Sequence, residues 1–171
     1  MRLRNRTRII SVICLLFWSI AYGQSDSLVY RIPSSSLADI SMITVPDGFV
    51  QATNFNGYLN SKLGSSIIMT LIENVDSPAM DDAWEQDPSR TFVSRDSLTT
   101  TNGYNVFMYK EETQAQIAGK TELIKIFQYT VFIGSGEKVL WLSISHSADI
   151  DELLQKGIMN TIMNADLTPG I

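Results

Sequence analysis

The sequence predicts an α+β domain in which an antiparallel β-sheet meander has helices packed on it, forming an α/β/α sandwich. Two turn signals, Asn102-Gly103 and Ser135-Gly136-Glu137, each lie between strand-like segments. Residues 123–134 carry apolar side chains on both faces of one predicted strand, so a further layer must cover each face. Apolar residues at three- and four-residue spacing in 150–162 then predict an amphipathic helix that covers one of these faces.

The first 23 residues have the pattern of a secretory signal peptide. Four arginines between Arg2 and Arg8 precede an apolar stretch of 13 residues, 9–21, and small residues at Ala21 and Gly23 suit a signal peptidase. A membrane-spanning helix needs about 20 apolar residues, so this stretch is too short for a stable membrane anchor. We therefore expect cleavage between Gly23 and Gln24, and a periplasmic or secreted protein.

Cleavage changes the composition of the chain. Residues 24–171 hold 9 basic and 18 acidic residues, a net charge of −9. Such a surface repels phosphate backbones and anionic membranes, which excludes nucleic-acid binding. Cys14 is the only cysteine and lies in the predicted signal peptide, so the exported chain has no disulfide, thiolate metal site or cysteine nucleophile. About 150 residues suffice for one core, and we expect a flexible lead-in at 24–38 and a single domain at 39–171.

The first half of this domain is expected to contain strands joined by turns. Residues 40–45 have the alternation of a short strand that ends at Pro46. Pro46-Asp47-Gly48 has turn chemistry, because proline fixes φ and glycine accepts a positive φ. Another strand is expected at 55–59. The segment 65–75 is apolar at both parities, which predicts a strand covered on both faces.

A short helix is expected over residues 78–86. Ser77 is a plausible N-cap and Pro78 fits the first helical position. Asp81 and Asp82 would then lie in the first turn, where the helix dipole favours acidic side chains. The sequence therefore predicts a crossing helix between the apolar strand and the strands that follow.

Two hairpins are expected to follow this helix. Residues 92–100 and 104–111 flank the Asn102-Gly103 pair, which two-residue hairpin turns prefer, and residues 123–134 and 138–146 flank the second turn. One face of the strand 123–134 carries Leu123, Phe127, Tyr129, Val131 and Ile133, and the other carries Ile124, Ile126 and Phe132.

His146, the only histidine, ends the apolar face of the strand 138–146 and is followed closely by Asp149, Asp151 and Glu152. A zinc site needs three or four ligands, and neither a calcium-loop pattern nor a G-x-S-x-G motif is present. Asp149 and Glu152 instead have the spacing of a helix capping box, with Ser147 or Asp149 as the N-cap. We interpret the stretch as a strand that leads into a helix, and we expect no catalytic or metal-binding residue here.

Several other features have structural interpretations. Residues 134–138 resemble a phosphate loop only superficially and predict a hairpin turn, and residues 118–121 resemble one still less. The tryptophans Trp84 and Trp141 lie on apolar faces, which favours core packing over a ligand groove. A solvated helix face is expected, in preference to a cation site, for the acidic residues Asp81, Asp82, Glu85 and Asp87.

Phe107 and Tyr109 share one face of a predicted hairpin strand. If this aromatic pair is exposed, it forms a contiguous apolar area of the kind that binds partners. Phe107 and Tyr109 are therefore the candidate binding surface that the sequence offers.

The order of these segments resembles the PsbP-like superfamily. The resemblance covers residues 40–165 and rests on VPDGF, FNGYL, a very apolar strand, a short helix after Pro78, the NGY hairpin, a glycine-rich hairpin leading into LWLSIS, and the closing helix DIDELLQKGIMNTI. This family also contains the Ran-binding protein Mog and many exported bacterial proteins. The resemblance implies a central antiparallel sheet between helical layers, an accessory or binding role, and no catalytic motif.

These observations favour an exported, non-enzymatic binding or accessory domain that acts on a protein partner in the cell envelope or outside, without a cofactor. Two alternatives stay open at this point. A small hydrolase would use a serine, an aspartate and His146 across neighbouring strands. A carrier would hold a small apolar ligand between sheet and helix, where methionines and aromatic residues could line the pocket.

Overall fold

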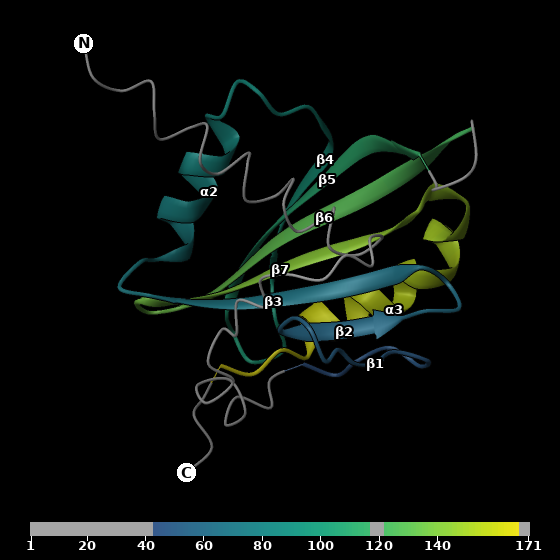
Figure 1. Cartoon of the computed structure of the whole chain (residues 1–171). Coiled ribbons are helices and arrows are strands. Elements are labelled where there is room, and N and C mark those ends of the chain that lie inside the picture. Colours follow the sequence, from purple (N-terminus) through teal and green to yellow (C-terminus); the bar gives the residue numbers. More distant parts are fainter. Residues whose placement is uncertain (1–42, 117–121, 168–171) are drawn as a thin grey trace. The chain divides into compact units, whose positions relative to one another are not determined.

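The computed structural model describes residues 43–116 and 122–167. In this part of the chain, seven strands form one antiparallel sheet in the order β1-β2-β3-β7-β6-β5-β4, and two α-helices pack against it (Figure 1). The α+β fold class predicted from the sequence is therefore confirmed. The strands are β1 (Val50–Gln51), β2 (Gly57–Asn60), β3 (Ser65–Glu73), β4 (Phe92–Thr99), β5 (Asn105–Gln116), β6 (Leu123–Ser135) and β7 (Lys138–Ser147).

The helices are α2 (Ser77–Glu85) and α3 (Asp151–Met163), and a short 3₁₀ helix, η1 (Ala148–Ile150), joins β7 to α3. Strands β4 to β7 pair in chain order, which is the predicted meander, and β1 to β3 form a second meander. The two meanders join where β3 pairs with β7. Helix α2 carries the chain from the middle of the sheet to its far edge and contacts β5 and β6.

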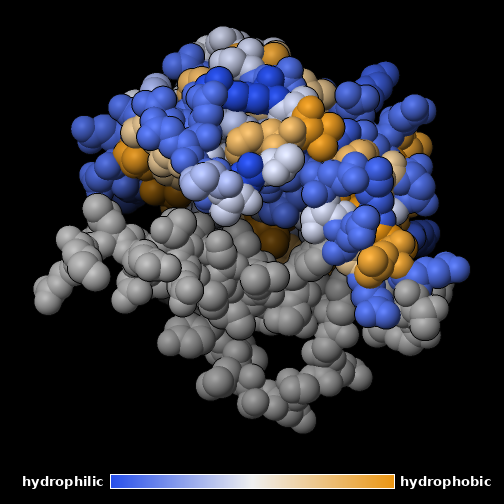
Figure 2. Space-filling model, turned by 90° about the horizontal axis from the view of Figure 1, so that it is seen from above, coloured by the Kyte–Doolittle hydropathy of each residue, from blue (hydrophilic) through white to orange (hydrophobic). Residues whose placement is uncertain are grey.

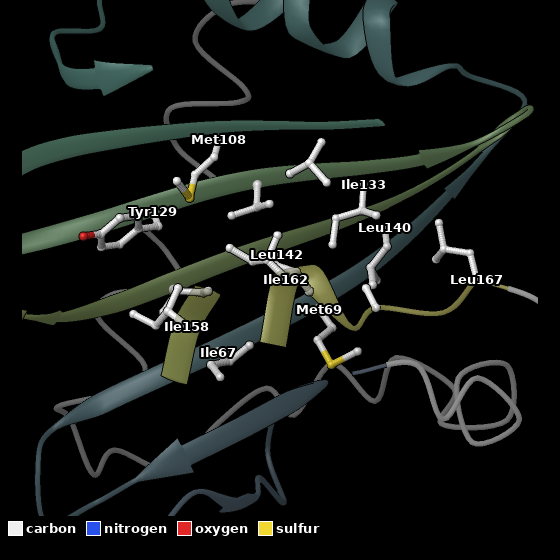
Figure 3. Close-up of a cluster of buried hydrophobic side chains, with 14 of the residues drawn as sticks. Ile67, Met69, Met108, Tyr129, Ile133, Leu140, Leu142, Ile158, Ile162 and Leu167 are labelled. Atoms are coloured by element: carbon white, nitrogen blue, oxygen red, sulfur yellow. The ribbon is translucent and has the colours of Figure 1, made fainter. Parts of the chain in front are cut away.

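The two faces of β6 belong to two separate hydrophobic clusters. Val131 and Ile133 pack with residues of α3, among them Ile158 and Ile162 (Figure 3). Phe132, between them in sequence, packs instead with Trp84 of α2. Because successive strand residues point to opposite faces, α3 and α2 cover opposite sides of the sheet. Trp84 is buried and Trp141 packs beside it, as their positions on apolar faces predict.

The β6–β7 hairpin follows the turn chemistry of its sequence. Ser135 pairs with Lys138, so Gly136 and Glu137 form a two-residue loop. Gly136 has φ +59, whereas Glu137 does not have a positive φ, which matches a type II′ turn. The glycine-rich segment is thus a hairpin turn, as predicted. The other segment compared with a phosphate loop, 118–121, lies outside the described residues.

The β4–β5 hairpin differs from the expected two-residue turn. Its loop has three residues, because the Thr100 amide donates to the Tyr104 carbonyl at 2.9 Å and Gly103, at φ +84, closes the turn. The Asn102 side chain reaches the end of α3 and donates to the Ala165 carbonyl at 2.9 Å. Thr101 donates to the Met163 carbonyl. The asparagine therefore links the hairpin to the helix.

The strand expected at 40–45 is absent over residues 43–45, which have no regular secondary structure. This segment instead contacts α3. The Thr161 hydroxyl donates to the Thr44 carbonyl at 2.6 Å, and Ile43 packs against the core. The predicted turn at Pro46-Asp47-Gly48 is confirmed by a hydrogen bond from the Phe49 amide to the Pro46 carbonyl. A tertiary contact with a helix has replaced pairing with a strand.

Two further expectations about local environment are wrong. Strand β3 buries only the face that carries Ile67 and Met69, while Ile68 on the other face is half-buried. The N-cap of α2 is Asp76, whose carboxylate accepts from the Ala79 amide at 2.8 Å, and Ser77 is buried inside the first turn. The helix therefore begins one residue earlier than expected, and both Asp81 and Asp82 lie beyond the first turn in which they were expected.

Candidate functional site

His146 lies at the end of β7 on the face that α3 covers, as its parity with Leu142 and Ile144 predicts. It pairs with Phe127 of β6, and its residue exposure is 1%. The imidazole ring packs 5.7 Å from the ring of Tyr129, measured between centroids, and 6.4 Å from that of Phe127. The only histidine of the chain is therefore enclosed by aromatic side chains.

Both nitrogens of this ring face an oxygen. Nδ1 lies 2.9 Å from the backbone carbonyl of Ser147, and Nε2 lies 3.4 Å from Oδ1 of Asp151. The carbonyl can only accept a hydrogen bond, so Nδ1 carries the proton in the neutral ring. Nε2 is buried and has no hydrogen-bond partner with suitable geometry. The approach to Asp151 is thus a close contact rather than a formed hydrogen bond.

Asp151, the first residue of α3, accepts hydrogen bonds from side chains of two further strands. Lys110 Nζ of β5 lies 2.6 Å from Oδ2, and the Tyr129 hydroxyl of β6 donates to Oδ1 at 2.7 Å. Burial acts to raise the pKa of Asp151, but the hydrogen bonds from Lys110 and Tyr129 outweigh it and hold that pKa below its ordinary value. We call Lys110, Tyr129, His146 and Asp151 the Asp151 cluster.

The other members of the cluster are shaped by the same environment. Burial, the hydrogen bond to Asp151 and nearby negative charge raise the pKa of Tyr129 well above its ordinary range, so the phenol remains a donor. Lys110 places its ammonium 3.8 Å from the centroid of the Phe127 ring, a cation–π contact. The side chains of Lys110 and Asp151 are only 15% and 16% exposed. The cluster is therefore a largely enclosed, internally paired polar site.

The expected helix cap next to this cluster is not formed. Neither Ser147, which precedes η1, nor Ile150, which precedes α3, makes a side-chain cap hydrogen bond. Asp149 accepts a hydrogen bond from the Ser147 hydroxyl and stays exposed. The chain inserts a 3₁₀ turn before α3, and this moves Asp149 out of the N-cap position.

Sequence reasoning found His146 and Asp151 but missed Lys110 and Tyr129 as their partners. One signal could have found Lys110, because it shares parity with buried Val106 and Met108 on β5. A lysine that continues an apolar face needs a counter-charge when it is packed. Tyr129 carries no such signal, since a tyrosine on an apolar face is ordinary core composition.

The predicted aromatic surface on β5 is not a surface. Tyr109 is fully buried, Phe107 is half-buried, and both pack in the cluster that α2 covers. The Tyr109 hydroxyl donates to the Asp81 carboxylate. Burial, followed by this contact, raises the pKa of Tyr109 well above its ordinary range. The two side chains therefore hold α2 to the sheet and do not form an exposed aromatic patch.

The acidic residues of α2 are only partly the solvated face that the sequence suggests. Asp82 is exposed, but Asp81 is buried and pairs with Arg95 of β4 at 2.6 Å. Arg95 also reaches Glu85 at 3.0 Å. Among residues 43–116 and 122–167, no three acidic, histidine or cysteine side chains gather in a way that could hold a metal ion.

A shallow open hollow of about 470 Å³ lies at the β1–β2 edge of the sheet. Its apolar lining comes from Val50, Leu59 and Leu63, and Lys62 adds a positive charge beside them. Val50 is 65% exposed. We call this hollow the edge groove.

Comparisons with known proteins give a weak structural likeness. No family model and no curated protein matches the chain. Among solved structures, it is similar to LpqN of Mycobacterium tuberculosis, which is described as involved in cell envelope biogenesis. The two are 16% identical, the match covers 70% of this chain and 78% of LpqN, and the TM-score is 0.45. A likeness of this size carries no information about function, and membership of the PsbP-like superfamily stays a prediction.

In the part of the chain that the structure describes, no helix combines the length and the apolar character needed to cross a bilayer. The predicted signal peptide, its cleavage site between Gly23 and Gln24, and the lead-in at 24–38 lie outside the described residues. Export therefore stays a prediction from the sequence.

Proposed function

We propose that this chain is an exported, non-enzymatic binding or accessory domain that acts on a protein partner in the cell envelope or outside. The observation that supports this proposal is the internal pairing of its reactive side chains. Lys110 and Tyr129 each donate a hydrogen bond to Asp151, and His146 is enclosed beside them. Side chains that are paired in this way stabilise the fold. We therefore expect the function to reside in binding at the surface.

The two alternatives find less support. A hydrolase needs a serine within hydrogen-bond reach of the histidine, whereas the ring of His146 faces a backbone carbonyl and a carboxylate, and the adjacent Ser147 hydroxyl donates to Asp149. A carrier needs space between sheet and helix. That region is filled by buried side chains of both layers, including Leu142, Ile158 and Ile162 (Figure 3).

The edge groove is the place where we expect the partner to bind. Elsewhere, on the face seen in Figure 2, hydrophilic residues predominate and the apolar residues form only small areas between them. The groove combines exposed Val50 with Leu59 and Leu63, and it lies at an edge of the sheet, where β1 pairs with β2 over only two residues. A partner side chain that enters this groove would cover apolar area and meet Lys62 at the rim.

A pair of matched variants tests this proposal. Val50→Asp places a charge in the edge groove, and Val93→Asp places the same charge on β4 at the opposite edge, where the valine is 54% exposed. Each tagged protein is used to capture partners from its own envelope extract, and the recovered proteins are quantified by mass spectrometry. We expect a protein recovered with the wild type to be retained by Val93→Asp and reduced about tenfold by Val50→Asp, because a charge in an apolar contact costs about 1–3 kcal/mol.

Equal recovery with both variants would contradict binding at the edge groove. Recovery of no protein by the wild type, together with a tightly bound lipid, would overturn the proposed function itself and favour the carrier.

A further inference from the structure

The Asp151 cluster lacks a hydrogen bond between Nε2 of His146 and the Asp151 carboxylate, and protonation of the imidazole would allow one to form. In the neutral imidazole of His146, Nδ1 holds the hydrogen that it directs to the Ser147 carbonyl at 2.9 Å. Nε2 then presents a lone pair to the Asp151 carboxylate, 3.4 Å away, and this buried nitrogen has no hydrogen-bond partner. In the imidazolium both nitrogens carry a hydrogen, and a small movement of the ring or of the carboxylate would bring the hydrogen on Nε2 into bonding geometry with Oδ1 of Asp151.

We propose that His146 and Asp151 form a proton-operated latch, which fastens the start of α3 to the sheet more tightly at mildly acidic pH. Asp151 is already held by Lys110 from β5 and Tyr129 from β6. Protonation of His146 adds a charge-assisted hydrogen bond from β7, so three adjacent strands then grip the first residue of the helix.

The charges around the ring allow the latch to work. Asp151 is ionised throughout the range in which histidines ordinarily titrate, about pH 5 to 8, so the acceptor is present when the proton arrives. Lys110 opposes a second positive charge, but it binds the other carboxylate oxygen, Oδ2. Beyond the cluster, the titratable or charged side chains on this face of the sheet and on η1 are Tyr58, Glu73, Asp96, Glu112, Lys125, Lys138 and Asp149. Glu112 and Lys125 form a pair at 3.0 Å, and α3 itself carries the exposed Glu152 and Lys156.

The bond between His146 and Asp151 should act on the first turn of α3. The polypeptide passes from His146 through η1 to Asp151 within five residues, so a bond between these side chains closes a small loop. In an α-helix the amides of Gln155 and Lys156 donate to the carbonyls of Asp151 and Glu152. These amides therefore report opening of the first turn of α3. The amide of Ile162, near the other end of α3, reports on the same helix away from the latch.

The test is hydrogen exchange by NMR on the protein after export, at pH 8 and pH 5, with rates corrected for the intrinsic effect of pH. We expect the protection factors of Gln155 and Lys156 to rise roughly tenfold at pH 5 relative to that of Ile162, since hydrogen bonds to charged groups are the stronger ones. The single histidine gives one Hε1 resonance, which follows the protonation of the ring without overlap from another histidine. Its titration midpoint should coincide with the midpoint of the change in protection.

Three variants separate the latch from a general effect of pH. His146→Gln and Asp151→Asn should each abolish the rise. Asp149→Asn should keep the rise, because this acid bonds to Ser147 and not to the ring. Equal protection of the wild type at both pH values, or a rise that persists in Asp151→Asn, would overturn the latch. Neither result would bear on the edge groove, because the latch does not depend on the proposed function.

Discussion

At the scale of single residues, two aspartates that lie two positions apart have different roles. Asp149 lies in η1, is exposed and accepts a hydrogen bond from the neighbouring Ser147. Asp151 begins α3 and accepts from side chains of two strands distant in sequence. Local sequence does not distinguish them, because both fit a first-turn acid near a helix N-terminus. The 3₁₀ turn between β7 and α3 decides which carboxylate faces the sheet.

Asp151→Asn is expected to destabilise the fold by about 2 kcal/mol, because it leaves the enclosed ammonium of Lys110 without a counter-charge. The free energy of unfolding, measured by urea denaturation at pH 7, tests this value. Asp149→Asn is the matched control and should change stability by less than about 0.5 kcal/mol. Equal effects of the two variants would contradict the role of Asp151.

The same residue predicts how stability depends on pH. The pKa of Asp151 is lower in the folded chain than its ordinary value, so its contribution is complete above about pH 4 and is lost as the pH falls through the folded pKa. The unfolding free energy of the wild type should therefore fall in acid more steeply than that of Asp151→Asn. Parallel curves below pH 4 would mean that Lys110 and Tyr129 do not lower the pKa of Asp151.

At the scale of secondary-structure elements, the positions of the hairpin turns were predicted better than the helix starts, although the β4–β5 loop is one residue longer than expected. Gly136 follows a local rule, since a two-residue hairpin needs a positive φ at that position. Ser77 fits the rule for an N-cap equally well, yet the structure buries it against the end of β6 and gives the cap to Asp76. Such a choice depends on what lies across the interface, which neighbours in sequence do not reveal.

The contact between α2 and β6 gives a second test. A Cβ added at Gly134 would overlap with Oγ and Cβ of Ser77, so the helix start lies directly on the strand. Gly134→Ala is therefore expected to destabilise the fold by about 1–3 kcal/mol through overpacking. Ser77→Gly in the same chain removes the clashing atoms and should recover most of that loss.

Thermal unfolding of the two single variants and the double variant measures the coupling between these positions. Additive effects of Gly134→Ala and Ser77→Gly would show that the two residues do not press on each other.

At the scale of the whole described fold, the sequence was sufficient for the layers because alternation in β6 assigns Val131 and Phe132 to opposite faces. The sequence was not sufficient to predict the conformation of residues 43–45, which contact α3 and do not pair with a strand. Nor was it sufficient for the candidate site, where His146 and Asp151 were visible but Lys110 arrives from β5. Periodicity reports which side of an element is buried, and it does not report which elements meet.

One sheet shared by two cores predicts that both cores unfold together. Ile162→Ala removes a fully buried side chain from the α3 side and is expected to cost about 2–5 kcal/mol. Trp84 and Trp141 both lie on the α2 side, so tryptophan fluorescence of the exported chain reports on the opposite core. Because β6 and β7 belong to both clusters, the fluorescence transition in urea should shift as far as the circular dichroism transition. A shift in circular dichroism alone would mean that α3 detaches while the α2 side stays folded.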